Sequence, residues 1–245
     1  MITSVKNEKV KRLKKLHKKK ERLQTSTFLI EGFHLLEEAW RSNWVIEEII
    51  VQENIQIPNW CKAFDIEIVT ENVFKHISET QTPQGIAAVI KMKEQTLDKG
   101  IFYLLIDAIQ DPGNLGTIIR TADACGVDGI ILGNGTVDLY NDKVIRATQG
   151  SIFHIPIIQA DLHDEIISLK EKGFSIWATA IENAKKYNEI PTREKVGLIL
   201  GNEGSGVDEF YIQLADEVVT IPIYGKAESL NVSIAAGILM YYIKG

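Results

Sequence analysis

Short apolar segments alternate with helical patterns along the first third of the chain. Apolar runs predict strands at 28–30, 45–51, 64–69 and 85–90, with helices at 31–40 and 72–76. A thin apolar stripe of Val10, Leu13, Leu16 and Leu23 predicts one helix over residues 5–23 with a mostly cationic surface. The alternation indicates a small α/β domain.

A second alternation begins at residue 101, after a polar segment, 91–100, that is expected to be a linker. Strands are predicted at 101–106, 129–132, 153–158, 174–179, 197–200 and 218–221, with helices at 115–125, 142–148, 162–170 and from 232 onwards. Asn114 is expected to cap the first of these helices, and Arg120 lies off its apolar face. The pattern predicts a mostly parallel sheet with helices on both faces. We therefore expect two domains, residues 1–95 and 101–245.

The composition is that of an ordinary globular protein. Of the 245 residues, 45% are hydrophobic and 24% are charged, and no apolar run approaches the roughly 20 residues of a membrane span. The basic N-terminus lacks the apolar segment of a signal peptide. Cys61 and Cys125 form no CxxC pair, and the five histidines show no ligand spacing. A reduced, cytoplasmic protein with no metal site and no membrane contact is the simplest interpretation.

The net charge of −6 hides a local excess of cations near the N-terminus. Residues 6–22 hold ten Lys or Arg and only two acidic residues, Glu8 and Glu21. Cations this close repel each other unless an anion neutralises them, so the segment predicts a polyanion partner. The alternative is a solvated basic helix without a partner. The expected contacts with such a polyanion are Lys14, Lys15, Lys18, Lys19 and Lys20.

Two apolar strands near the end of the chain each run into a loop that contains glycine. The strand 197–200 opens into Gly201-Asn-Glu-Gly-Ser-Gly206, and the strand 218–221 opens into a loop over 222–231. Glycine lets the backbone approach a ligand closely, so two such loops predict one binding crevice. Lys226 is the only cation in these loops, and no GxGxxG turn is present. A nucleoside-type cofactor without phosphates therefore fits better than a nucleotide.

Polar side chains gather at the loops and helix starts of this second half: Asn114, Arg120, Glu203, Ser229 and Asn231. Each has an ordinary structural explanation. The asparagines and the serine can cap helices, Arg120 can pair with Asp123, and Glu203 can be a surface acid at a turn. Five such groups on the loop edges of one domain favour a catalytic site over five separate structural roles.

Three motifs stand in order across residues 101–245: Asp111-Pro-Gly-Asn-Leu-Gly-Thr-Ile-Ile-Arg120, Leu200-Gly-Asn-Glu-Gly-Ser-Gly206, and Ile221-Pro-Ile-Tyr-Gly followed by Glu228-Ser-Leu-Asn-Val-Ser233. Together they resemble the motifs of the SpoU (TrmH) family of RNA 2′-O-methyltransferases. The N-terminal part more loosely resembles the substrate-binding domain of some members, through Phe28-Leu-Ile-Glu-Gly32 and Thr82-Pro-Gln-Gly85. Val207 and Ile223 stand where the family commonly has Leu and Met.

The resemblance implies an enzyme that uses S-adenosylmethionine to methylate a ribose 2′-hydroxyl in ribosomal RNA or tRNA. It also implies a homodimer and a trefoil knot in the C-terminal domain. The catalytic or substrate positions that it implies are Asn114, Arg120, Glu203, Ser229 and Asn231. The implied cofactor positions are Thr179, Ala180, Gly201, Asn202, Gly206, Ile221, Ile223 and Leu230. This cofactor carries a sulfonium and no phosphate, in agreement with the scarcity of cations in the loops.

The resemblance casts Arg120 as the group that acts on the 2′-hydroxyl. Because arginine stays protonated in proteins, we expect Arg120 to hold the RNA phosphate or to stabilise the developing alkoxide. The proton would then leave through the phosphate or water. Two other classes stay open from the residues alone: a dinucleotide oxidoreductase, which should show GxGxxG, and a non-catalytic RNA-binding protein, which would bind no cofactor. The sequence identifies neither the RNA nor the nucleotide.

Overall fold

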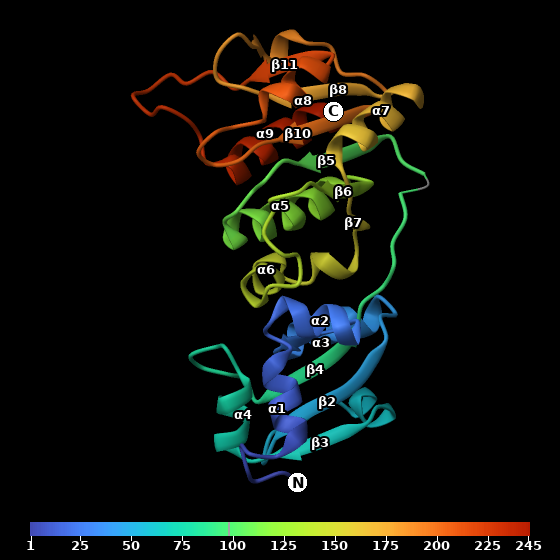
Figure 1. Ribbon diagram of the computed structural model, residues 1–245, viewed down its shortest axis with the longest axis vertical. Coiled ribbons are helices and arrows are strands. Elements are labelled where there is room, and N and C mark those ends of the chain that lie inside the picture. Colours follow the sequence, from blue (N-terminus) through green and yellow to red (C-terminus); the bar gives the residue numbers. More distant parts are fainter. Residues whose placement is uncertain (98) are drawn as a thin grey trace. The chain divides into compact units, whose positions relative to one another are not determined.

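The computed structural model describes residues 1–97 and 99–245, and its contacts divide the chain into two compact units (Figure 1). Unit 1 contains Met1–Glu94 and Asp138–Phe153, and unit 2 contains Gln95–Val137 and His154–Gly245. Asp98, within the predicted linker, lies outside the described residues. Unit 1 thus includes a short segment from the second half of the chain, which the order of the predicted elements does not reveal.

Unit 1 is built on a mixed four-stranded sheet with the order β1-β4-β2-β3. The β1–β4 and β4–β2 pairs are antiparallel, and the β2–β3 pair is parallel. The strands are β1 (Thr27–Glu31), β2 (Ile46–Gln52), β3 (Ile66–Val69) and β4 (Ile86–Lys91). The helices are α1 (Glu8–Lys15), α2 (Lys19–Thr25), α3 (Phe33–Arg41), α4 (Glu71–Ile77) and α6 (Asp142–Thr148), with short 3-10 helices η1 (Asn59–Ala63) and η2 (Ser151–Phe153).

Alternate residues of the strands in unit 1 pack against different partners. Leu29 of β1 and Val89 of β4 lie in one apolar cluster with residues of α1 and α4, including Leu13 and Phe74. Successive strand residues point to opposite faces, so Phe28 faces the other side. There the Phe28 ring lies 4.5 Å from the ring of Tyr140, which belongs to the segment 138–153.

The segment 138–153 is held in unit 1 by buried contacts. The Phe153 ring stacks 6.5 Å from that of Phe28, and Trp44 Nε1 donates a hydrogen bond to the Phe153 carbonyl at 3.0 Å. Burial raises the pKa of Tyr140 to about 12, with a smaller contribution from Asp138. These aromatic and polar contacts show that the segment completes the core of unit 1.

The prediction of one helix over 5–23 was wrong, because α1 ends at Lys15 and α2 begins at Lys19. The turn between them is fixed by two side chains. Arg22, only 4% exposed, donates from Nη1 to the Leu16 carbonyl at 2.8 Å and forms an ion pair with Asp138. His17 Nε2 donates to the Ile77 carbonyl at 2.8 Å.

Unit 2 contains a seven-stranded parallel sheet with the order β7-β6-β5-β10-β8-β11-β9 among the described residues. The strands are β5 (Phe102–Ile106), β6 (Gly129–Leu132), β7 (Ile157–Gln159), β8 (Ser175–Thr179), β9 (Lys185–Lys186), β10 (Val196–Leu200) and β11 (Glu217–Thr220). Ile106 pairs with Leu200, so β5 and β10 end at the same level and their following loops begin side by side. The predicted fold class is confirmed.

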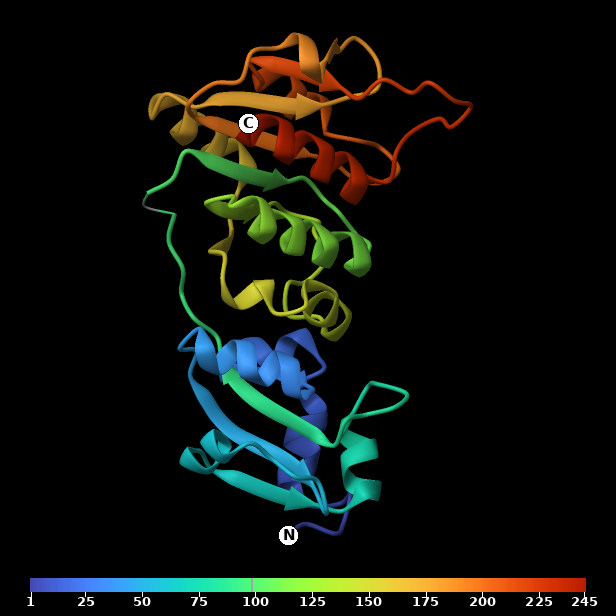
Figure 2. The same cartoon turned by 180° about the vertical axis from the view of Figure 1, so that it is seen from behind.

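Helices cover both faces of this sheet. Residues of α7 (Leu162–Glu171) and α8 (Glu209–Leu214) join an apolar cluster with Leu105 and Ile199 of the strands. The long helices α5 (Pro112–Cys125) and α9 (Val232–Lys244) pack against each other outside that cluster (Figure 2). The strand predicted at 153–158 is shorter, and neither α8 nor β9 was predicted. A 3-10 helix, η3 (Tyr187–Glu189), follows β9. Within the described chain, every helix is too short or too polar to span a membrane.

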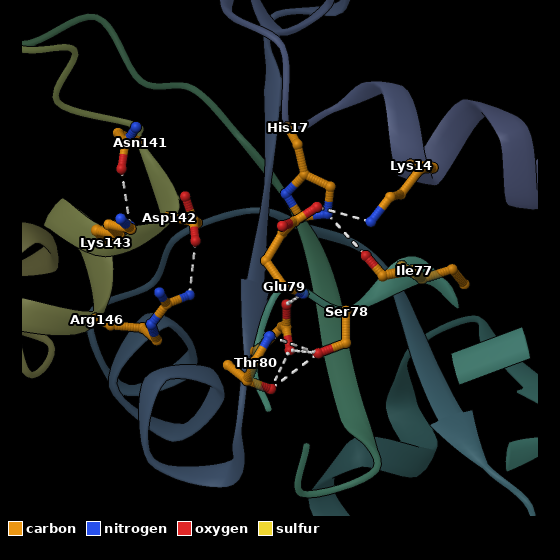
Figure 3. A network of polar contacts seen from close by, with 11 residues as sticks. Lys14, His17, Ile77, Ser78, Glu79, Thr80, Asn141, Asp142, Lys143 and Arg146 are labelled. Carbon is orange, nitrogen blue, oxygen red and sulfur yellow. Dashed lines mark hydrogen bonds and ion pairs between the residues drawn. The ribbon is translucent and has the colours of Figure 1, made fainter. Parts of the chain in front are cut away.

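Asp138→Ala should destabilise unit 1 by about 3 kcal/mol, because the buried Arg22 guanidinium would lose its ion pair. A matched control is Asp142→Ala, which breaks the more exposed pair with Arg146 on α6 (Figure 3). That change should cost less than about 1 kcal/mol. Urea unfolding curves of both variants give the comparison. Equal losses would contradict a structural role for the Arg22–Asp138 pair.

Candidate functional site

A cavity of about 980 Å³ lies in unit 2 at the carboxyl ends of the neighbouring strands β10, β8 and β11. Ligands of open parallel sheets bind at this edge, and the volume is at the upper end for a small-molecule site. All eight residues that sequence reasoning assigned to the cofactor line the cavity: Thr179, Ala180, Gly201, Asn202, Gly206, Ile221, Ile223 and Leu230. They come from the ends of three strands and from the loop before α9.

The loop after β10 is folded back on itself. Asn202 and Gly206 exchange two backbone hydrogen bonds, of 3.0 and 2.9 Å. A Cβ atom on Gly201 would overlap the backbone of Gly206 and Val207, and Gly206 has a φ of +75°, which favours glycine. The loop can therefore close in this way only with glycine at position 201.

The side chain of Asn202 is used to hold loops rather than to face the cavity as a free amide. Its Oδ1 accepts from the backbone of Gly204 at 2.8 Å and of Ser205 at 3.2 Å. Its Nδ2 donates to the carbonyl of Ala108, in the loop after β5, at 2.7 Å. Asn202 thus joins the loops that follow β5 and β10.

Asn114 does not cap α5, contrary to the prediction. The cap is Asp111, whose Oδ1 accepts from the Asn114 backbone N–H at 2.7 Å. The Asn114 side chain is therefore free to bridge two other site residues. Its Nδ2 donates to Glu203 at 3.0 Å, and its Oδ1 accepts from Asn231 Nδ2 at 2.9 Å. Asn231 caps α9, as predicted, by accepting from Ser233 N at 2.9 Å.

The Glu203 carboxylate accepts hydrogen bonds from three donors. Besides Asn114, the backbone N–H groups of Gln110 and Asp111 donate to it at 3.2 and 3.1 Å. Partial burial acts to raise the pKa of Glu203, but these hydrogen bonds outweigh it and hold the pKa below its usual value. Glu203 is therefore a charged acceptor that fixes the start of α5, and it is poorly suited to take up a proton.

Two predicted catalytic residues keep free polar groups. Arg120 is exposed on α5, outside the cavity lining, and its guanidinium has no hydrogen-bond or ion-pair partner in the described part of the chain. The structural alternative for Arg120 was wrong, since Asp123 accepts instead from His154 Nδ1 at 2.8 Å. Ser229 lines the cavity, caps no helix, and likewise has no partner among the described residues.

Two residues that hold the helices of this part of unit 2 were missed from the sequence. An Asp directly before a Pro at the first helical position is a known start signal, so Asp111 could have been found as the cap. Asp107, at the end of β5, accepts from the Asp208 backbone at 2.7 Å and so holds the start of α8. Burial raises the pKa of Asp107 above its usual value. In the sequence, the position of Asp107 directly after a strand is the one feature that could have identified it.

The cavity fits S-adenosylmethionine by the chemistry of its lining. None of the lining residues is Lys or Arg, whereas three acids, Asp111, Glu203 and Glu228, lie around it. Apolar side chains such as Ile221 and Leu230 supply a surface for a nucleoside. An uncharged nucleoside with a cationic sulfonium suits this set, and a pyrophosphate does not.

Gly201→Ala should destabilise the protein by about 1–3 kcal/mol and abolish S-adenosylmethionine binding. The loop that lines the cavity would have to move to make room for the alanine side chain. Gly204→Ala is the matched control, since its Cβ would meet only Asn202 Oδ1 at 3.4 Å. Thermal unfolding and titration calorimetry measure both effects. Wild-type cofactor affinity in Gly201→Ala would contradict this account of the loop.

Comparison with known proteins agrees with the geometry. The family model described as SpoU rRNA Methylase family matches residues 101–241, and the MRM3-like substrate binding domain matches residues 7–88. The chain is similar to the 23S rRNA (guanosine(2553)-2′-O)-methyltransferase RlmP of Bacillus subtilis, with 49% identity over 100% of this chain and 99% of that protein.

Solved structures give the same result. The AdoMet-bound rRNA methyltransferase from Sinorhizobium meliloti superimposes with a TM-score of 0.91 at 33% identity, over 99% of this chain and 96% of that one. A second crystal structure, described as an RNA 2′-O ribose methyltransferase, has a TM-score of 0.85 at 32% identity, over 99% and 97% of the two chains. The chain belongs to the SpoU rRNA methylase family and is an S-adenosylmethionine-dependent RNA 2′-O-ribose methyltransferase.

Proposed function

We propose that this enzyme methylates the 2′-hydroxyl of a guanosine in 23S ribosomal RNA. The observation that carries the proposal is the set of Asn114, Glu203 and Asn231, which are hydrogen-bonded in series at the rim of a cavity without cations. The relative from Bacillus subtilis, which matches both parts of the chain, supports the choice of RNA and nucleotide. A ribosomal RNA substrate would place the reaction in the cytoplasm.

Each site residue has a role that its contacts allow. S-adenosylmethionine supplies a methyl group on a positively charged sulfur, and the eight cavity residues named above would hold it. Asn114 and Asn231 each keep one amide hydrogen for the ribose, because their other contacts fix the orientation of both amides. Ser229 offers a hydroxyl without a partner, which can accept from or donate to the same sugar.

Arg120 is the group best suited to the charge that develops on the attacking oxygen. Its guanidinium is exposed and uncommitted, and it cannot give up its proton at neutral pH. We therefore assign to Arg120 the stabilisation of negative charge on the 2′-oxygen or the binding of the adjacent phosphate. The hydroxyl proton then passes to the phosphate or to water, since three hydrogen bonds to the Glu203 carboxylate lower its pKa and favour its charged form.

The proposal is tested by incubating the enzyme with labelled S-adenosylmethionine and separate transcripts of 23S rRNA, 16S rRNA and tRNA. We expect label in the 23S transcript alone, on one guanosine ribose, when the product is digested and mapped by mass spectrometry. Label on a base, on another nucleotide type, or mainly on tRNA would overturn the assignment.

In the same assay, Arg120→Ala should reduce the single-turnover rate by about a hundredfold or more at saturating RNA and cofactor. Folding and cofactor binding should persist, because the Arg120 side chain is exposed and does not pack in the core. Arg120→Lys should restore little, since an ammonium lacks the fork geometry of a guanidinium. Asp123→Ala is the control and should react at nearly the parent rate. A near-parent rate in Arg120→Ala would remove Arg120 from the catalytic site.

We also propose that unit 2 forms a homodimer through α9, because this helix exposes large apolar side chains. Ile234 is 55% exposed and Tyr241 is 57% exposed, and they lie seven residues apart on α9, two turns along the helix. The double variant Ile234→Glu, Tyr241→Glu should sediment as a monomer of 27.5 kDa, and the parent as twice that mass. Ile167→Glu, at 41% exposure on α7, is the control and should stay dimeric. A monomeric parent at micromolar concentration would refute the proposal.

A further inference from the structure

Eight of the ten cations of the N-terminal arm (residues 6–22) fall into two groups with different surroundings. We propose that Lys15, Lys18, Lys19 and Lys20, here called the lysine patch, bind phosphate groups of the substrate RNA, whereas Lys9, Arg12, Lys14 and Arg22 serve the fold of unit 1. This inference rests on the proposed RNA substrate and identifies which part of unit 1 contacts its backbone.

The first turns of the arm are neutralised within unit 1. Lys9 Nζ lies 2.7 Å from Glu48 and 3.1 Å from Glu67, and Arg12 pairs with the same Glu48. Glu48 is buried, so both cations are needed to offset the cost of its charge. Lys9 and Arg12 thus bind the helix α1 to the sheet, and their charges are offset by acids of unit 1.

Lys14 is also committed, although sequence reasoning placed it among the polyanion contacts. Its Nζ lies 2.7 Å from Glu79, two residues beyond the end of α4. Figure 3 shows this pair. The hydrogen bond from Lys14 is the main cause that lowers the pKa of Glu79. Arg22 is buried against Asp138. Four of the ten arm cations are therefore neutralised by acids of unit 1 that lie far from them in the sequence.

The lysine patch has no such partners. All four side chains are exposed, and none has an ion pair or a side-chain hydrogen bond within the described residues. They lie within six consecutive positions, so their charges repel at short range unless an anion is bound. The fold places acids in ion pairs with Lys14 and Arg22, on either side of this patch, and places none in an ion pair with the patch itself among the described residues.

The patch sits on a turn that the fold holds rigid. His17 and Arg22 bond to the carbonyls of Ile77 and Leu16, and the Asp138 pair locks Arg22 in place. The lysine backbones are therefore positioned before RNA arrives, while their side chains stay free to follow a phosphate chain. Lysine binds phosphate as a point charge without reading bases, so the patch would position the RNA and leave the choice of guanosine to the site in unit 2.

The test compares two quadruple variants of the full-length enzyme that remove the same charge. The first changes Lys15, Lys18, Lys19 and Lys20 to Gln. The control changes Lys62, Lys91, Lys93 and Lys99 to Gln, which are likewise exposed and without ion pairs among the described residues. The probe is a fluorescent transcript of 23S rRNA around the guanosine methylated by the relative, and its affinity is measured by anisotropy at several salt concentrations.

We expect the patch variant to bind more weakly and its slope of log affinity against log salt to fall by about three, for four lost phosphate contacts. The control should keep nearly the parent slope and the parent rate of methyl transfer at saturating RNA. Equal slope changes in the two variants, or a parent slope in the patch variant, would overturn the proposal. Failure of the parent to methylate this RNA would instead count against the proposed function, because the slopes are measured independently of methyl transfer.

Discussion

The Glu203 carboxylate joins parts of the site that are distant in the sequence. It accepts hydrogen bonds from the backbone N–H groups of Gln110 and Asp111 and from the side chain of Asn114. The Asn114 side-chain oxygen in turn accepts a hydrogen bond from Asn231 Nδ2. A carboxylate with this many donors stays ionised and well oriented. The starts of α5 and α9 and the loop after β10 are therefore connected through one charged group. Arg120 lies on α5, so its position also depends on the contacts that Glu203 makes with the start of that helix.

The same site depends on close backbone approach. The folded loop after β10 leaves no room for a Cβ at Gly201, and the Asn202 amide then ties this loop to Ala108. The cavity is thus shaped by backbone and by amides that are already bonded, and its lining has no basic side chain. A site of this kind selects its cofactor by shape and by the absence of phosphate-binding groups.

Sequence reasoning succeeded where the pattern of apolar and polar residues within a segment is enough to determine the secondary structure of that segment. The buried strands of unit 2 are continuous apolar runs, and α6 was predicted to the residue. It failed where the deciding partner is remote. Asn114 and Asp111 are both good caps, and only the position of Glu203, 89 residues after Asn114, shows that the Asn114 side chain points elsewhere. The arm is broken between α1 and α2 because Arg22 turns inward to Asp138, 116 residues away, and no spacing rule contains that information.

The membership of residues 138–153 in unit 1 bears on how this protein could be divided. A cut at residue 95 would leave Phe28 and Trp44 without the rings of Tyr140 and Phe153, and Arg22 without its counter-ion. The remaining fragment would carry the same aromatic residues exposed between β6 and β7. The two halves of the sequence are therefore not interchangeable modules, and a chimera that exchanges the RNA-binding part must bring along a second, internal piece of chain.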